Sequence, residues 1–86
     1  MNNGLIIREF EALAERLGIH LRTTASGPSG MCRVKGKLVF FFERGLSSDE
    51  RVNLFIREFS RLDLDAVYVV PLIRELIDMK PDSDWD

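Results

Sequence analysis

The sequence has few residues of the kinds that carry most enzyme chemistry. Among its 86 residues there is one cysteine, Cys32, and one histidine, His20. A single cysteine allows no disulfide within the chain, and a structural zinc site needs about four Cys or His ligands. A catalytic triad would have to use His20 as its imidazole, and no nucleophile-elbow sequence is present. We therefore expect no catalytic residues, no metal, no cofactor and no enzyme activity.

Glycine-rich phosphate-binding patterns and membrane-length apolar runs are also missing. Gly27, Gly30 and Gly36 fit neither GxxxxGK[ST] nor GxGxxG, so a bound nucleotide cofactor has no support. No apolar run approaches the ~20 residues that a membrane span needs. The Asn2–Asn3–Gly4 start lacks the basic region of a signal peptide. We expect a cytoplasmic protein without a membrane partner.

The residues that are present predict one small globular domain. Hydrophobic residues make up 45% of the chain and charged residues 30%, with six glycines and three prolines. Such a composition is typical of ordinary globular domains, and a chain of this length builds one modest core. We expect a single α+β domain over residues 1–79 and an acidic flexible tail over residues 80–86. Trp85 in this tail is a candidate second anchor for a partner.

Apolar spacing and capping signals predict three helices. Apolar residues recur at helical intervals over residues 5–17, with Asn3 as the candidate N-cap. The Ser-Ser-Asp-Glu stretch that begins at Ser47 is typical of a capping box, and a helix from 48 to about 61 follows it. Pro71 suits the first turn of a third helix.

Three segments have the pattern of strands. Residues 19–24 alternate as a short half-buried strand does, and residues 31–35 and 37–43 predict a β-hairpin around Gly36. Residues 66–70 are β-branched and extended. The predicted class is an α/β (α+β) two-layer fold, in which a three-stranded, mostly antiparallel sheet carries helices on one face.

Alternation gives the hairpin two faces. The residues predicted to share the first face are Cys32, Val34, Val39 and Phe41. The large apolar residues predicted for the other face are Met31, Leu38, Phe40 and Phe42. Three short helices cannot cover both faces of such a sheet, and a monomer rarely exposes an apolar patch of this size. We therefore expect the second group to form an interface with a second copy, as a homodimer, or with another protein.

Cys32 has two interpretations. The cations Arg33 and Lys35 favour a reactive thiolate, which would give a thiol-dependent activity. Strand alternation instead places Cys32 among apolar residues and directs the cations the other way. We therefore expect a buried, inert thiol.

Charge is unevenly distributed along the chain. Residues 22–44 hold five basic residues against one acidic residue, whereas residues 45–86 hold five basic and ten acidic residues. The hairpin cations Arg33, Lys35 and Lys37 form a candidate basic patch, and a nucleic-acid-binding module that uses this patch is the alternative function. The net charge of −2 gives no general attraction to nucleic acid, so the protein partner ranks first.

A degenerate motif lies within the predicted second helix. The string Arg57-Glu58-Phe59-Ser60-Arg61 has the spacing of the zinc-protease motif H-E-x-x-H, with arginine at both histidine positions. Together with the helix, strand and hairpin before it, this helix resembles the minimal core of zinc-dependent metallopeptidases, particularly the small bacterial type that cleaves phage repressors. The resemblance covers roughly residues 5–62. The chain also resembles a group of short uncharacterised bacterial proteins, through Gly30, Cys32, Val34, Gly36 and Lys37.

Arginine cannot replace the metal-binding histidines of that motif. A guanidinium group stays protonated and offers only hydrogen-bond donors. Arg57 and Arg61 would repel a metal ion, and Glu58 would have no metal-bound water to activate. The resemblance therefore implies a zincin-like scaffold without its metal site. Without the resemblance, Glu58 and Arg61 simply pair on a helix surface. On either interpretation we expect a non-catalytic interaction module.

Overall fold

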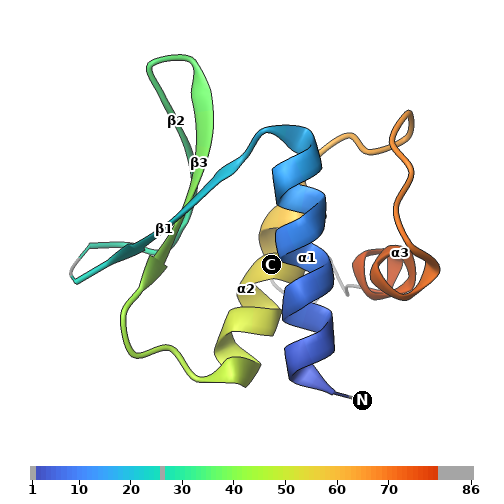
Figure 1. Ribbon diagram of the computed structural model, residues 1–86, viewed down its shortest axis with the longest axis horizontal. Coiled ribbons are helices and arrows are strands. Elements are labelled where there is room, and N and C mark those ends of the chain that lie inside the picture. The colour runs from blue at the N-terminus through green and yellow to red at the C-terminus, as the bar shows by residue number, and fades with distance from the viewer. Residues whose placement is uncertain (1, 26, 80–86) are drawn as a thin grey trace.

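The computed structural model describes residues 2–25 and 27–79 (Figure 1). The elements along the chain are α1 (Asn3–Leu17), β1 (His20–Thr24), β2 (Gly30–Val34), β3 (Lys37–Glu43), α2 (Ser48–Phe59) and α3 (Pro71–Asp78). This confirms the α+β class with its three helices and three strands. The predicted acidic tail and Trp85 lie outside the described residues.

The three strands form one mixed sheet in the order β1-β3-β2. β2 pairs antiparallel with β3, as the predicted hairpin requires, whereas β1 pairs parallel with β3. One of the two strand pairs is therefore parallel, so the sheet is mixed and not mostly antiparallel. The hairpin turn is Lys35-Gly36, and both residues have positive φ angles, 51° and 82°. A two-residue turn of this type matches the twist of the strands and explains the glycine at Gly36.

The helix ends follow the capping chemistry of the sequence with small shifts. Asn2, one residue before the predicted cap, accepts a hydrogen bond from the Gly4 N–H at 2.8 Å. The predicted capping box is confirmed: the Ser47 hydroxyl accepts from the Glu50 N–H at 3.1 Å, and the Glu50 carboxylate accepts from the Ser47 N–H at 2.9 Å. α2 ends at Phe59, two residues earlier than predicted. Residues 66–70, predicted to be extended, join no strand of the sheet, and the prediction is wrong at their start, where residue 66 belongs to a turn and residue 67 to a bend.

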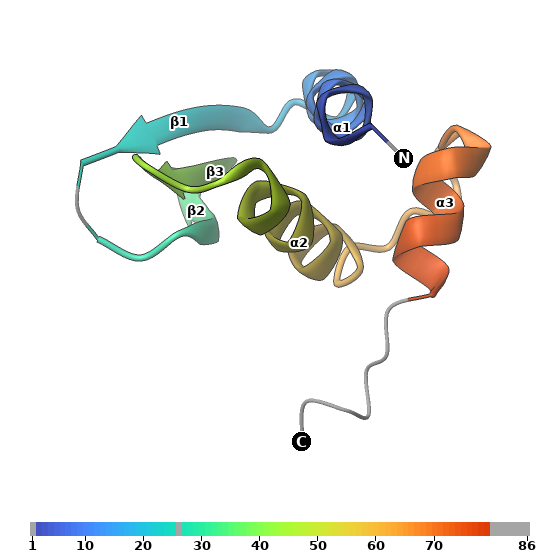
Figure 2. The same cartoon turned by 90° about the horizontal axis from the view of Figure 1, so that it is seen from below.

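All three helices lie on the same side of the sheet. α1 and α2 lie side by side next to the sheet, and α3 lies beyond them, as two perpendicular views show (Figure 1, Figure 2). α3 contacts α1 and α2, so it covers no part of the sheet. The second face of the sheet is left without a covering layer within the described residues.

Phenylalanine rings fill the space between the helices and the sheet. The rings of Phe10 and Phe55 stack with centroids 4.9 Å apart, and those of Phe40 and Phe42 stack at 4.5 Å. Phe55 also lies 5.2 Å from Phe40 and 5.0 Å from Phe42, which joins the two pairs into one cluster. Each buried aromatic ring removes a large apolar surface from water, and the aliphatic residues of the core pack around this cluster.

The predicted interface residues lie in or against this core. Phe40 is fully buried and Phe42 is 3% exposed, while Met31 and Leu38 are partly buried and pack against the core. The helices cover the face with the larger apolar side chains, because packing against that face removes more apolar surface from water. The prediction of a surface patch at Met31, Leu38, Phe40 and Phe42 is therefore wrong.

Candidate binding surface on the open face of the sheet

The uncovered side of the sheet, here called the open face, is defined by strand register. His20 and Cys32 both pair with Val39, Arg22 and Gly30 both pair with Phe41, and Val34 pairs with Lys37. Paired residues of neighbouring strands point to the same side of a sheet. The side chains of the open face are therefore His20, Arg22, Cys32, Val34, Lys37, Val39 and Phe41, together with the pair Thr24 and Glu43 at the far end of β1 and β3.

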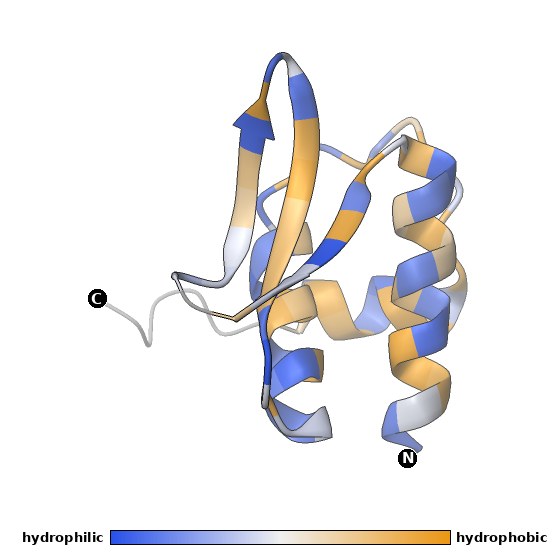
Figure 3. Ribbon diagram, turned by 60° about the vertical axis from the view of Figure 1, so that its left-hand side comes forward, coloured by the Kyte–Doolittle hydropathy of each residue, from blue (hydrophilic) through white to orange (hydrophobic). Residues whose placement is uncertain are grey.

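An apolar centre lies along the open face. Val39 is buried by its neighbours, Phe41 is half-buried, and Val34 is 42% exposed. The central strand is orange over most of its length in Figure 3, because residues 38–42 are all apolar. An unbroken apolar strand is typical of a sheet that is covered on both faces. In this protein, only one of the two apolar faces is covered.

The Phe41 side chain separates two hollows in the open face. A basic hollow of about 360 Å³ is lined by His20, Arg22, Val34, Lys35, Lys37, Val39 and Phe41. A neutral hollow of about 480 Å³ is lined by Thr24, residues 27–32 and Phe41. Gly30, the β2 partner of Phe41, has a φ of 142°, and a side chain at this position would lie against the Glu58 carboxylate of α2 and not beside the Phe41 ring. The Phe41 side chain itself lines both hollows.

The cations of the basic hollow have no local counter-charge. Within residues 2–25 and 27–79, the ion pairs are those of Arg57 and Arg61 with Glu58. Arg22, Lys35 and Lys37 thus keep their charges without a carboxylate partner in the described part of the chain. No acidic residue lines the basic hollow. This side of the sheet therefore has a positive potential, although the whole chain has a net charge of −2.

The structure divides the predicted basic patch between the two faces. Lys35 and Lys37 line the basic hollow, but Arg33 pairs with Leu38 on the helix side and donates to the Gly36 carbonyl at 3.2 Å. Arg22 takes the place of Arg33, because the parallel pairing of β1 brings it beside β3. The prediction missed Arg22 and His20, since strand alternation within the hairpin gives no information on where β1 pairs.

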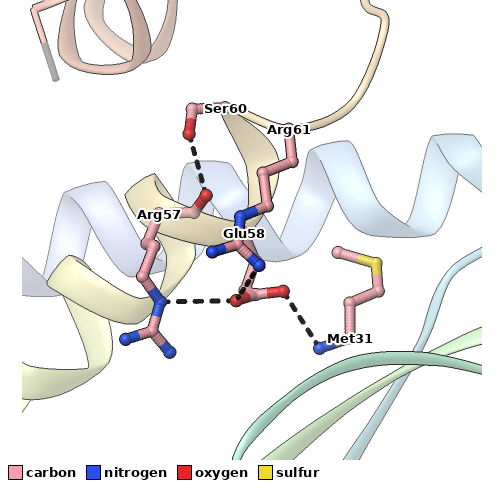
Figure 4. A network of polar contacts seen from close by, with 5 residues as sticks. All are labelled: Met31, Arg57, Glu58, Ser60 and Arg61. Carbon is pink, nitrogen blue, oxygen red and sulfur yellow. Dashed lines mark hydrogen bonds and ion pairs between the residues drawn. The ribbon is translucent and has the colours of Figure 1, made fainter. Parts of the chain in front are cut away.

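The Arg57-Glu58-Arg61 motif makes a structural contact between α2 and β2. Glu58 is 9% exposed, and its Oε1 accepts a hydrogen bond from the Met31 N–H at 3.3 Å (Figure 4). Its Oε2 lies 3.3 Å from Arg57 Nε and 3.7 Å from Arg61 Nη1. The predicted pairing of Glu58 with Arg61 is therefore present. The Glu58 carboxylate is buried, however, and not free on the helix surface as predicted. Both carboxylate oxygens are occupied by donors from the protein itself.

Among the residues that the structure describes, no group of three or more His, Cys, Asp or Glu residues is arranged to hold a metal ion. The Glu58 carboxylate faces two guanidinium groups, which disfavour a cation at that point. The residues at the motif therefore do not fit the zinc ion that the metallopeptidase resemblance would imply.

Cys32 is exposed, so the prediction of a buried thiol is wrong. The prediction that Cys32 shares a sheet face with Val34, Val39 and Phe41 is confirmed. The thiol is accessible because no helix covers this face. His20 and Cys32 lie on opposite sides of Val39, so their backbones are about 10 Å apart, which is two strand spacings. Val39 lies between them, and no hydrogen bond joins the Cys32 thiol to the His20 ring in the described part of the chain.

Comparison with known proteins gives no match: no protein-family model, curated protein or solved structure matches this chain. Within the described residues, none of the helices has the length and apolar character that crossing a membrane requires. The functional assignment therefore depends on the geometry of the open face.

Proposed function

We propose that this protein is a non-catalytic binding module, acting in the cytoplasm, whose partner docks on the open face of the sheet. The observation that carries the proposal is the one-sided arrangement of the helices. Their packing leaves the apolar centre at Val34, Val39 and Phe41 uncovered and beside cations that have no local counter-charge. A partner that covers this face would bury apolar surface and neutralise Arg22, Lys35 and Lys37.

The sequence predicts a homodimer or another protein as the partner, through Met31, Leu38, Phe40 and Phe42, which lie in or against the core. If two copies instead paired through their open faces, the homodimer would bring two cationic surfaces together. Each copy would contribute Arg22, Lys35 and Lys37 to the contact. Like charges that face each other destabilise an interface. The geometry therefore favours an anionic partner over a second copy with the same face.

Amide spectra of isotope-labelled protein test the proposal with three probes added separately. The probes are the protein itself in a concentration series, an oligoglutamate peptide, and a single-stranded oligouridylate. We expect at least one probe to give saturable shifts at residues 20–24, 30–34 and 37–43, with α1 and α3 unchanged. Saturable shifts confined to the helices, or no saturable shift with any of the three probes, would overturn the proposal.

A pair of charge-matched variants makes this test specific. Lys37→Gln removes one positive charge from the open face, and Arg33→Gln removes one from the same hairpin on the other side. We expect Lys37→Gln to weaken the response and Arg33→Gln to leave it unchanged. Equal effects of the two variants would mean that net charge, and not the open face, controls binding.

A further inference from the structure

We infer that the open face binds single-stranded nucleic acid, an inference that rests on the proposed function and names its partner. The observation that carries it is the position of one accessible aromatic ring between a basic hollow and a neutral hollow. Phe41 lines both hollows, Arg22 of β1 pairs with it on one side, and Gly30 of β2 pairs with it on the other. Proteins that bind single strands combine aromatic platforms for the bases with cations that follow the phosphates.

The Phe41 ring supplies a stacking platform for a base. It is half-buried, so its position is held by the sheet while part of the ring remains accessible. Stacking on an aromatic side chain is tolerant of base identity, because every base has a π-face. The two hollows beside the ring are open to solvent, so a base that stacks on Phe41 has room on this surface for its sugar and phosphate.

The basic hollow supplies the contacts to phosphate. Arg22 and Lys37 come from neighbouring strands, and Lys35 comes from the hairpin turn, so the charges are spread over one side of Phe41. His20 also lines this hollow, and a ring N–H of its imidazole can donate a hydrogen bond to a phosphate oxygen. The acidic excess of the chain lies in residues 45–86, whose described helices pack behind the sheet. Glu43 is the acidic residue that the register places on the open face, two residues beyond Phe41, whereas α1 and α2 hold their described carboxylates on the helix side.

A double helix fits this surface poorly. Its bases are stacked inside and present only their edges, so the Phe41 ring would have no exposed π-face to contact. An acidic peptide would neutralise Arg22, Lys35 and Lys37, but glutamate side chains have no flat apolar surface for the ring. The joint presence of the ring and the cations therefore favours a single strand over both alternatives.

Fluorescence anisotropy of a labelled oligouridylate of about eight nucleotides, measured between about 50 and 200 mM salt, tests the inference. Three neutralised phosphates predict a slope of about −2 for log K against log salt, at about −0.7 for each phosphate on a single strand. We expect Arg22→Gln and Lys37→Gln each to reduce this slope by about 0.7. Arg33→Gln, the matched control on the helix side, should leave the slope unchanged.

Substitution of the ring separates stacking from charge. Phe41→Ala should weaken binding roughly 5- to 150-fold, which corresponds to the ~1–3 kcal/mol typical of one stacked base, with no change in the salt slope. Phe41→Tyr keeps an aromatic face and should retain the affinity within about threefold. A far-UV spectrum of each variant confirms that it is folded. Wild-type affinity in Phe41→Ala, or equal effects of Lys37→Gln and Arg33→Gln, would overturn the inference.

The same titration with oligoglutamate and with a duplex of matched length separates this inference from the proposed function. Weaker binding of both competitors supports it. If oligoglutamate binds at least as tightly and shifts the amides of the open face, the partner is an acidic polypeptide: the inference fails and the binding module stands. If none of the three shifts those amides, the inference fails, and the proposed function fails with it when the protein's own concentration series gives no saturable shift either.

Discussion

Two adjacent phenylalanines of the central strand give the most direct test of which sheet face the helices cover. Phe40 is fully buried, with ring centroids 4.5 Å from Phe42, 5.2 Å from Phe55 and 6.0 Å from Phe59. Phe41 points to the open face and is half-buried. Replacing each by alanine removes the same ring from two different environments.

The expected costs differ by several-fold. Phe40→Ala leaves a cavity inside the aromatic cluster and should lower the free energy of unfolding by about 4 kcal/mol, within the range for buried phenylalanine. Phe41→Ala loses partial burial without a closed cavity and should cost about 1 kcal/mol. A domain of 86 residues has roughly 4–13 kcal/mol in total, so Phe40→Ala approaches its limit. Phe40→Leu, at about 1–2 kcal/mol, keeps the comparison measurable if Phe40→Ala does not fold.

Urea unfolding followed by circular dichroism gives the two values in one experiment. A slope of about 1 kcal/mol per molar urea converts the Phe41→Ala cost into a midpoint shift of about 1 M. A Phe41→Ala cost equal to or above that of Phe40→Ala would refute the packing described above. It would mean that the helices, or a second copy of the chain, cover the face that the structure leaves open.

Three further predictions follow from individual contacts. Glu58→Ala should cost about 2 kcal/mol in urea unfolding because the partly buried Met31 N–H loses its charged acceptor. Glu58→Gln should cost about half as much because an amide oxygen can still accept, and equal costs would contradict the hydrogen-bond assignment. Cys32 is exposed, so a thiol reagent should modify the native protein at close to the rate of the unfolded chain, and modification only after denaturation would contradict the open face. The hydrogen bond from the Ser47 N–H lowers the pKa of the Glu50 carboxyl. The ionised carboxylate therefore stabilises the folded state above the ordinary glutamate pKa of about 4.3. This stabilisation is lost as the pH falls through the lower pKa of the folded state. Glu50→Gln should therefore unfold with a weaker pH dependence than the wild type below about pH 4.3, and identical acid unfolding curves would rule out this role.

Local chemistry in the sequence determined the elements of this protein. The capping box at Ser47, the proline at Pro71 and the glycine turn at Gly36 each act within a few residues, so their outcomes can be predicted without knowledge of the fold. Alternation also determined that Cys32 shares its face with Val34, Val39 and Phe41, because the side-chain period of a strand is two.

Only the tertiary structure decided which of the two hairpin faces became the core. Both faces of β3 are apolar, and the larger side chains of the Phe40 face favour its burial, but alternation alone does not determine that the helices cover one face and leave the other open. The choice depends on where the faces of α1 and α2 pack, which is a sum over contacts between residues far apart in the chain. The same long-range packing places β1 parallel to β3 and brings Arg22 to the basic hollow, and it buries Glu58 against Met31. The candidate binding surface is therefore a product of packing that no local pattern of the sequence determines.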